Sequence, residues 1–370
     1  MEVIRCYEVK LKPNKTQFRQ LNQYLYEAKL LYNYLLNQEV PIFQLKSVCK
    51  MKDIWKFDEE KNQVGVKLEI LPAKLKQNVH RQIMSSIKAL AELKKKGKKV
   101  GKLKNKERVW TLNLDNQSWK VRDHNHVSIL GFGRQKIKCC GLRQLEDKSI
   151  KRLRDVKLTK KKDGNFYLLI SVKKEIFPLP KKNQDVGLDL GIESTVTTSD
   201  REKWNCKISE TKKLKNLQRK IARSKRLNNK KRTRNQFKLR IKLRKQYQRI
   251  SNLKKEFVHQ KMHYLNFQYD HVVFQDESIR GWRNLKGNKK TIQHSCLGDF
   301  KQNLIWRSIE NSSKFIMLDK WVPTTQYCRC CGKKNKHELQ ERTYHCSCGY
   351  TEDRDVHAAK NMLHFAGLTA

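Results

Sequence analysis

Two closely spaced cysteine pairs near the C-terminal end carry the clearest chemical signal in the sequence. Cys328 and Cys331 form the first pair, Cys346 and Cys348 form the second, and a glycine follows each pair directly. Four thiolates with this spacing are a common ligand set for a structural zinc ion, and a glycine lets the backbone turn sharply behind the sulfurs. The alternative is a set of buried or disulfide-bonded cysteines, but packing alone rarely produces such paired spacing. The spacing therefore predicts a tetrahedral Zn²⁺ site with these four ligands.

The second pair departs from the usual pattern, because one residue separates its cysteines instead of two. Two neighbouring side chains offer other donor atoms. His345 or Cys330 could replace one of the four expected ligands.

Three acidic residues at the ends of apolar segments indicate a second kind of site. Asp189 ends a short apolar strand, Glu277 ends another, and Asp355 begins a helical segment rich in small residues. A carboxylate in apolar surroundings is costly unless it is paired, hydrogen-bonded or bound to a cation. Asp355 alone could be a helix N-cap. Together, three carboxylates converging in one β/α domain of ribonuclease-H-like type predict a site for two Mg²⁺ or Mn²⁺ ions, which support in-line attack on a phosphodiester.

The charge balance of the chain points to a polyanionic partner. Its 370 residues contain 83 Lys and Arg against 36 Asp and Glu, a formal charge of +47. Nucleic acid fits this excess, particularly because Trp, Tyr and Phe are interleaved with the basic residues. A membrane surface is the alternative, but no apolar run is long enough to span a bilayer, and we find no signal peptide or lipidation motif. We therefore expect nucleic acid and no membrane.

Cysteine usage bears on the compartment. The chain has eleven cysteines, and the seven outside the two pairs are scattered without a disulfide framework. We expect a reducing compartment, that is, a cytoplasmic protein, associated with the nucleoid if the source is prokaryotic.

The first half of the chain alternates between strand and helix patterns. Residues 1–12 alternate as a strand, and two apolar stripes of helical period follow, at about 16–35 and 75–93. Residues 94–108 are predicted to be a flexible basic connection. Residues 109–177 have the pattern of short strands, with a hairpin turn at Asp163–Gly164. The pattern predicts a small antiparallel β-barrel interrupted by helices.

The second half begins after a proline-containing linker at about 178–183. Short strands are predicted at 186–192, 195–197, 271–277 and 315–318, with Gly191 allowing a close backbone approach. The region 212–261 is helical and almost free of acidic residues, with Leu214, Leu253 and similar residues on its buried side. A solvated charged helix normally mixes both signs, so this region favours contact with a phosphate backbone.

Four segments of the chain resemble a known family. Gly187–Ile192, the strand that ends at Glu277, the two cysteine pairs and the segment Asp353–Met362 are similar to the split RuvC nuclease of the TnpB (OrfB) family. These proteins are encoded by insertion sequences and are related to type V CRISPR effectors. The resemblance spans nearly the whole chain and is most specific from residue 186 onward.

The resemblance implies an RNA-guided DNA endonuclease that uses Mg²⁺ or Mn²⁺ and contains Zn²⁺. Such a protein holds a guide RNA from the transposon end, recognises a short motif beside a double-stranded DNA target, pairs the guide with one strand and cuts the DNA.

Residue by residue, Asp189 matches the first catalytic Asp of the family and Asp355 matches the last. The middle position departs from the family pattern Glu-Asp-Leu, since Gln275 stands where Glu is expected. Side chains alternate along a strand, so Glu277 would share the face of Gln275 while Asp276 points away. We assign the middle role to Glu277, with Asp276 as the alternative. His357 also replaces a more usual Asn.

The expected fold class is α+β and multidomain. We predict a wedge-like β-barrel domain from 1–12 and 109–180, with a helical recognition domain inserted at 13–108. A ribonuclease-H-like (RuvC) α/β nuclease domain follows at 183–324 and 350–370, interrupted by a zinc knuckle at 325–349.

Two other functions remain open. One is an RNA-guided DNA-binding protein without cleavage, similar to a repressor, because relatives of this family can lose their acids. The other is a DNA-binding accessory protein of transposition. The presence of both Asp189 and Asp355 favours the nuclease.

Overall fold

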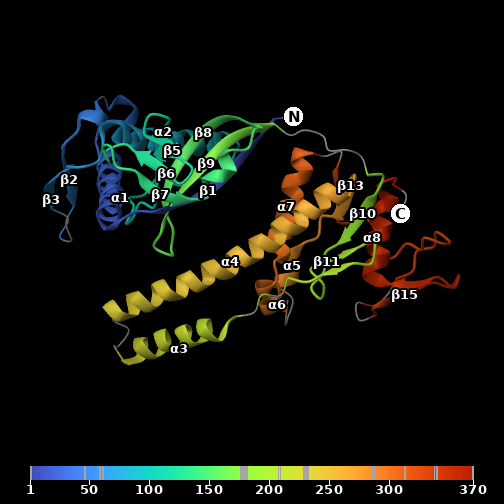
Figure 1. Cartoon of the computed structure of the whole chain (residues 1–370). Helices are drawn as coiled ribbons and strands as arrows, with labels where there is room; N and C mark the ends of the chain where they lie inside the picture. The colour runs from blue at the N-terminus through green and yellow to red at the C-terminus, as the bar shows by residue number, and fades with distance from the viewer. Residues whose placement is uncertain are drawn as a thin grey trace. The chain divides into compact units, whose positions relative to one another are not determined.

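The chain forms two compact units, residues 1–177 and 178–370 (Figure 1). The computed structural model describes residues 2–45, 47–57, 60, 62–175, 182–206, 208, 210–227, 233–284, 288–311, 314–336, 338 and 341–368. Most of the predicted linker therefore lies outside the described residues. No helix in the described ranges has the length and apolar character needed to cross a membrane.

The first unit is built on a seven-stranded, barrel-like antiparallel sheet with the strand order β4-β8-β9-β1-β7-β6-β5. Its strands are β1 (Glu2–Lys12), β4 (Thr111–Leu114), β5 (Trp119–Asp123), β6 (His126–Ile129), β7 (Ile137–Cys140), β8 (Ile150–Lys160) and β9 (Phe166–Glu175). β8 and β9 are joined through Asp163 and Gly164, which has a φ of +88°. The predicted antiparallel sheet, which combines the first strand with strands after residue 109, is confirmed. β4 and β5 are its two edges.

Two helices pack against this sheet. They are α1 (Lys15–Leu36), which begins with an Asn14 capping box, and α2 (Ala73–Lys95). The apolar stripes that predict both helices are buried in the same core as the sheet, except towards the end of α2, where Ile87 is 39% exposed. The segment between them, which has no clear sequence pattern, contains short 3-10 turns at Ile42–Gln44 and Val48–Lys50 and a hairpin of β2 (Asp53–Phe57) and β3 (Gln63–Lys67).

The second unit contains a mixed five-stranded sheet with the order β12-β11-β10-β13-β14. Its strands are β10 (Asp185–Asp189), β11 (Val196–Thr198), β12 (Lys203–Trp204), β13 (His271–Gln275) and β14 (Phe315–Leu318). β13 is parallel to β10 and to β14, whereas β11 is antiparallel to β10 and to β12. The strands predicted around Asp189, at 195–197 and at 315–318 are thus present.

The two faces of this sheet pack against different helices. Val186 and Leu188 share a core with α4 (Arg234–Gln268) and α7 (Leu297–Glu310). Side chains alternate along a strand, so Gly187 and Asp189 lie on the other face, which α8 (Arg354–Phe365) covers (Figure 1).

The strand predicted at 271–277 is shorter than expected. β13 ends at Gln275, and the amide of Glu277 donates to the carbonyl of Gln275 (2.9 Å), so the backbone turns at Asp276. Strand parity therefore does not decide where the side chains of Asp276 and Glu277 point.

The basic helical region forms α3 (Lys212–Leu227) and α4, which contact each other. Leu214, Leu217 and Ile221 of α3 are buried as predicted, whereas Leu253 of α4 is 49% exposed. The buried side of α4 lies further along, at Val258, Met262 and Leu265. The remaining elements are the short helices α5 (Ile279–Asn284) and α6 (Asn288–His294) and a hairpin of β15 (Thr343–His345) and β16 (Thr351–Asp353).

A close backbone contact between β10 and α8 fixes their distance. A Cβ atom on Gly187 would lie 1.8 Å from the carbonyl oxygen of Ala359, so only glycine fits at this position. The residue predicted to allow close approach, Gly191, does not have this role, because a Cβ there would meet only Ser194 of the same loop, at 3.0 Å.

We predict that Gly187→Val destabilises the second unit. The added side chain forces α8 away from β10 and should lower the free energy of unfolding of the full chain by about 1–3 kcal/mol or more, measured in urea. Gly298→Ala in α7 is the control, because a Cβ there meets nothing within 4 Å. It should leave stability unchanged or raise it by up to about 1 kcal/mol. A Gly187→Val protein as stable as the parent would contradict this account of the contact.

Candidate functional site

The three acids singled out in the sequence lie at one edge of the five-stranded sheet. Asp189 is the last residue of β10, Glu277 follows the end of the parallel strand β13, and Asp355 is in the first turn of α8, which packs on β10. Burial raises the pKa of Asp189 well above its ordinary value, and the negative charges of Asp355 and then Glu277 raise it further. The charges of Asp355 and Glu277 therefore both act on Asp189.

These three carboxylates have few partners. Among the described residues no hydrogen bond reaches any of them, and the shortest ion-pair distance is 3.9 Å, from Arg354 Nε to Asp355 Oδ1. Asp353 is different: it caps α8 by accepting from the amides of Asp355 and Val356, and it pairs with Lys203 at 2.7 Å. The N-cap role is thus taken by Asp353, which leaves Asp355 available to a ligand.

Lys301 of α7 distinguishes Asp276 from Glu277. Its ammonium group pairs with Asp276 Oδ1 at 2.6 Å and also donates to the backbone carbonyl of Glu277. Burial raises the pKa of Glu277, with Lys301 opposing and Asp276 adding to the shift. Lys301 thus neutralises Asp276, whereas the negative charge of Glu277 helps to raise the pKa of Asp189.

Gln275 has a structural role. Its side chain is 3% exposed, and its amide donates to the carbonyls of Asp319 (3.1 Å) and Val322 (2.8 Å) and accepts from the hydroxyl of Thr324 (3.0 Å). With its hydrogen-bonding capacity used in this way, it anchors the chain that leads into the cysteine segment.

Two residues of α8 also hold the cysteine segment and the chain that leads into it. Asn361 donates to the carbonyls of Thr324 (2.6 Å) and Tyr327 (2.8 Å). His357 is fully buried and stacks on Tyr344 of β15, with ring centroids 3.8 Å apart. The histidine that replaces a more usual Asn therefore packs between α8 and the cysteine-bearing hairpin.

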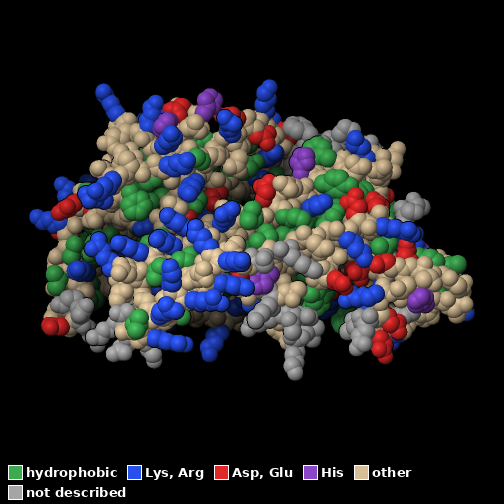
Figure 2. All heavy atoms as spheres, turned by 60° about the horizontal axis from the view of Figure 1, so that its bottom comes forward, with side chains coloured by type: hydrophobic (Ala, Val, Ile, Leu, Met, Phe, Trp, Pro, Cys, Tyr) green, Lys and Arg blue, Asp and Glu red, His purple; other side chains and the backbone are tan. Residues whose placement is uncertain are grey.

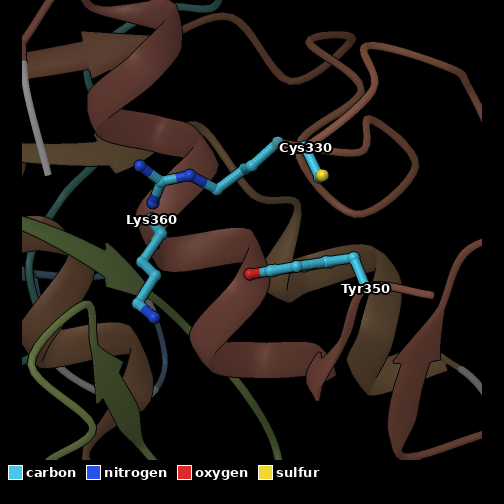
Figure 3. Close-up of a pocket in the computed structure, with 4 residues that line it drawn as sticks. Cys330, Tyr350 and Lys360 are labelled. Atoms are coloured by element: carbon cyan, nitrogen blue, oxygen red, sulfur yellow. The ribbon is translucent and has the colours of Figure 1, made fainter. Parts of the chain in front are cut away.

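Glu352 is a connecting residue that sequence inspection misses. It lies in β16, its side chain is 7% exposed, and it accepts from Tyr350 and Lys360 and from Arg201 at 3.3 Å. Beside it is a pocket of about 280 Å³ lined by Arg329, Cys330, Tyr350 and Lys360, in which Tyr350 extends towards α8 (Figure 3). A single Glu in a polar segment offers no sequence signal, because Lys360 and Arg201 approach it only in the folded chain.

The four paired cysteines are brought together. The Sγ atoms of Cys328, Cys331, Cys346 and Cys348 all lie within 4.8 Å of one another. Cys328 and Cys348 are 3.7 Å apart, and Cys331 and Cys346 are 3.5 Å apart. Thiolates bonded to Zn²⁺ at about 2.3 Å in a tetrahedron lie about 3.8 Å apart, so the donor set fits zinc.

The alternative ligands are not part of this cluster. Cys330 lies outside it and is exposed, and His345 Nδ1 contacts the hydroxyl of Thr351 at 3.3 Å. The single-residue spacing is accommodated by a turn in which Gly349, with a φ of +88°, donates to the carbonyl of Cys346.

The surface of α3 and α4 is strongly basic. α3 carries eight Lys and Arg and no acidic residue, and α4 carries ten, with Glu256 as its only acid. Figure 2 shows many Lys and Arg side chains on the face that contains these helices. Such a surface is complementary to a phosphate backbone.

Two family models and a curated protein match parts of the chain. Residues 169–283 match a family model described as "Probable transposase" of the OrfB/IS605 type, and residues 298–362 match one described as "Cas12f1-like, TNB domain". A curated protein of Streptomyces pristinaespiralis, named "Putative RNA-guided DNA endonuclease", is 29% identical over 221 residues, which cover 58% of this chain. The matched part spans about half of that relative, 53% of its length.

One solved structure is similar at low identity. It is described as a Cas12f1-sgRNA-target DNA complex, is 13% identical, and the alignment covers 97% of this chain and 98% of that chain with a TM-score of 0.23.

We predict that one zinc ion per chain co-purifies with the protein and that Cys331→Ser removes it. Loss of a ligand should also lower the melting temperature, because the ion stabilises only the folded hairpin. Cys330→Ser is the matched control, since it changes a neighbouring cysteine outside the cluster, and it should keep its zinc. Elemental analysis checks both; equal zinc in the two variants would contradict the assignment.

Proposed function

Because the chain belongs to the TnpB-like (OrfB) family, we propose that it is an RNA-guided DNA endonuclease. Its RuvC-like second unit would cut target DNA by two-metal phosphodiester hydrolysis next to a short motif. Its partners would be a guide RNA from the transposon end and a double-stranded DNA target.

The observation that carries this proposal is the set of three weakly partnered carboxylates at one sheet edge. Burial, and then the charges of Asp355 and Glu277, raise the pKa of Asp189, so keeping Asp189 ionised beside these two acids is unfavourable without a cation. Carboxylate oxygens are the donors that Mg²⁺ and Mn²⁺ prefer. Asp189, Glu277 and Asp355 would hold the ions, which when bound supply a Lewis acid and an activated nucleophile.

The surrounding residues would orient these ligands. Lys301 fixes the turn that presents Glu277, and Asp353 caps the helix that presents Asp355. The basic surface of α3 and α4 would hold nucleic acid through its phosphates. Cys328, Cys331, Cys346 and Cys348 would bind Zn²⁺, which would stabilise the hairpin packed against α8.

A cleavage-deficient, repressor-like DNA-binding protein is the second candidate, with a DNA-binding accessory of transposition as a further one. Neither of these functions requires three converging carboxylates. The unfavourable electrostatics of Asp189 therefore support the nuclease, because a binding protein gains nothing from it.

We predict that Asp189→Asn, Asp355→Asn and Glu277→Gln each lower DNA cleavage more than about a hundredfold, because each removes a metal ligand. Binding of RNA and target should persist. Asp276→Asn is the matched control and should keep substantial activity, because Lys301 already neutralises Asp276. Cleavage is measured with RNA-loaded protein and Mg²⁺. An inactive Asp276→Asn beside an active Glu277→Gln would reverse the assignment.

Asp189→Asn should also raise the melting temperature of metal-free protein at neutral pH. A carboxyl group whose pKa is higher in the fold than in the unfolded chain destabilises the fold once the pH exceeds the unfolded value. The parent should gain stability from added Mg²⁺, and the variant should gain less. A metal-free variant that is less stable than the parent would argue for a structural role of Asp189.

We further predict that the purified protein carries RNA and that its RNA affinity falls steeply with salt. The double variant Arg219→Glu and Arg223→Glu, on the exposed side of α3, should flatten the dependence of log K on log salt by about 0.7 for each phosphate that the variant no longer neutralises. Lys333→Glu with Lys334→Glu gives the same change in net charge on the cysteine segment and serves as control. Equal slopes for the two double variants would exclude a specific role of α3.

A further inference from the structure

A second pocket lies in the first unit, apart from the residues discussed so far. It has a volume of about 550 Å³ and lies between edge strand β5, the short 3-10 turn Leu142–Leu145 and the beginning of β8. Sequence inspection gives no hint of it, because its three walls are separate in the chain and each has an ordinary composition.

Strand irregularities create this pocket. Ile150, Lys151, Arg152 and Leu153 are consecutive in β8 and all line it, although successive side chains of a regular strand point to opposite faces. The register of β8 against β9 shifts twice here, between Ile150 and Arg152 and between Leu153 and Val156. β-Bulges of this kind re-aim side chains and often border binding sites.

The opposite wall of the pocket also contains an irregular strand. Val121, Arg122 and Asp123 of β5 also line the pocket in succession, and the register of β5 against β6 shifts between Val121 and Asp123. Since β5 is an edge of the sheet, its outer side has no partner strand among the described residues. The register shifts of β5 and of β8 thus border one pocket.

The lining separates into an apolar floor and a charged rim. Leu142 is buried on the floor, and Val121 is 44% exposed above it. On the rim, Arg122 is held by the hydroxyl of Ser128 (2.9 Å) and Lys151 by Glu175 (2.9 Å). The Arg152 side chain is exposed and makes no hydrogen bond or ion pair within the described part of the chain.

Two acids complete the rim. Asp123 accepts from the amide of Asn125, which together with His126 holds the pKa of Asp123 at about 2, and Glu146 contacts His124 Nδ1 at 2.6 Å. Their carboxylates accept hydrogen bonds and cannot donate them. A ligand for this pocket therefore combines an apolar part, an anionic part and a donor group.

We propose that this pocket binds one unpaired RNA nucleotide. The base would lie on the apolar floor beneath the planar Arg152 guanidinium, its phosphate would face Arg152 and Lys151, and the ribose 2′-hydroxyl or a base amino group would donate to Asp123 or Glu146. Unstacked bases are recognised in this way by apolar and guanidinium surfaces, and the 2′-hydroxyl distinguishes RNA from DNA. The inference rests on the proposed RNA-guided function and specifies where a single-stranded part of that RNA is held.

The experiment uses two substitutions with matched controls in the full chain. Arg152→Gln removes the unpartnered cation, and Arg154→Gln makes the same change two residues further along β8, outside the pocket lining. Val121→Glu places a charge above the floor of the pocket, and Val64→Glu places one outside the pocket lining, at a position of similar exposure, 40%, in β3. Affinity is measured for a single-stranded RNA and for DNA of the same sequence at one salt concentration, with melting temperatures as the folding check.

Arg152→Gln and Val121→Glu should each weaken RNA binding by roughly tenfold, with a smaller loss for DNA, while both controls bind as the parent does. Ultraviolet cross-linking of RNA to the parent should mark peptides containing residues 119–124 or 142–153. Unchanged RNA affinity in both pocket variants would overturn the proposal and leave the pocket to another ligand, such as a peptide strand added to β5. Equal losses on RNA and DNA would overturn the assignment to RNA. A chain that binds no RNA at all would instead refute the proposed function itself.

Discussion

The close contact between Gly187 and Ala359 is the constraint on which the second unit depends. Because no side chain separates β10 from α8 at this point, the strand end and the helix start are held together, and with them Asp189 and Asp355. The same helix carries His357 and Asn361, which hold the cysteine hairpin and the chain leading into it. One backbone approach thus sets the position of both the carboxylate site and the candidate zinc site.

Placing carboxylates near one another costs free energy, and the surrounding structure lowers this cost by pairing some of them with lysines. Asp353 and Asp276 stand next to Asp355 and Glu277, yet each is neutralised by a lysine, Lys203 and Lys301 respectively. If all of these acids lacked partners, their mutual repulsion would be larger. Pairing the neighbours leaves Asp189, Glu277 and Asp355 as the acids without a lysine partner among the described residues, and a cation bound to them would stabilise the fold.

The sequence was informative where local rules dominate. Helical periodicity predicts α1 and α2, Asp163–Gly164 predicts the β8–β9 turn, and cysteine spacing predicts the cluster. It was uninformative where distant residues meet. The end of β13 depends on bonds from Gln275 to Asp319 and Val322, the role of Gly187 depends on Ala359, and the pairing of Asp276 depends on Lys301. No periodicity or propensity within one segment contains these contacts.

The distribution of charge differs between the two units. On α3 and α4 the cations outnumber the single acid so strongly that intramolecular ion pairs cannot balance them, and their repulsion persists in the isolated chain. In the first unit the charges around the β5–β8 pocket are mostly paired, and the open position is Arg152. A long polyanion suits the first surface and a single nucleotide suits the second. Guide binding would then draw on both kinds of site, since phosphates along α3 and α4 supply affinity without regard to sequence, whereas a pocket sized for one base supplies register.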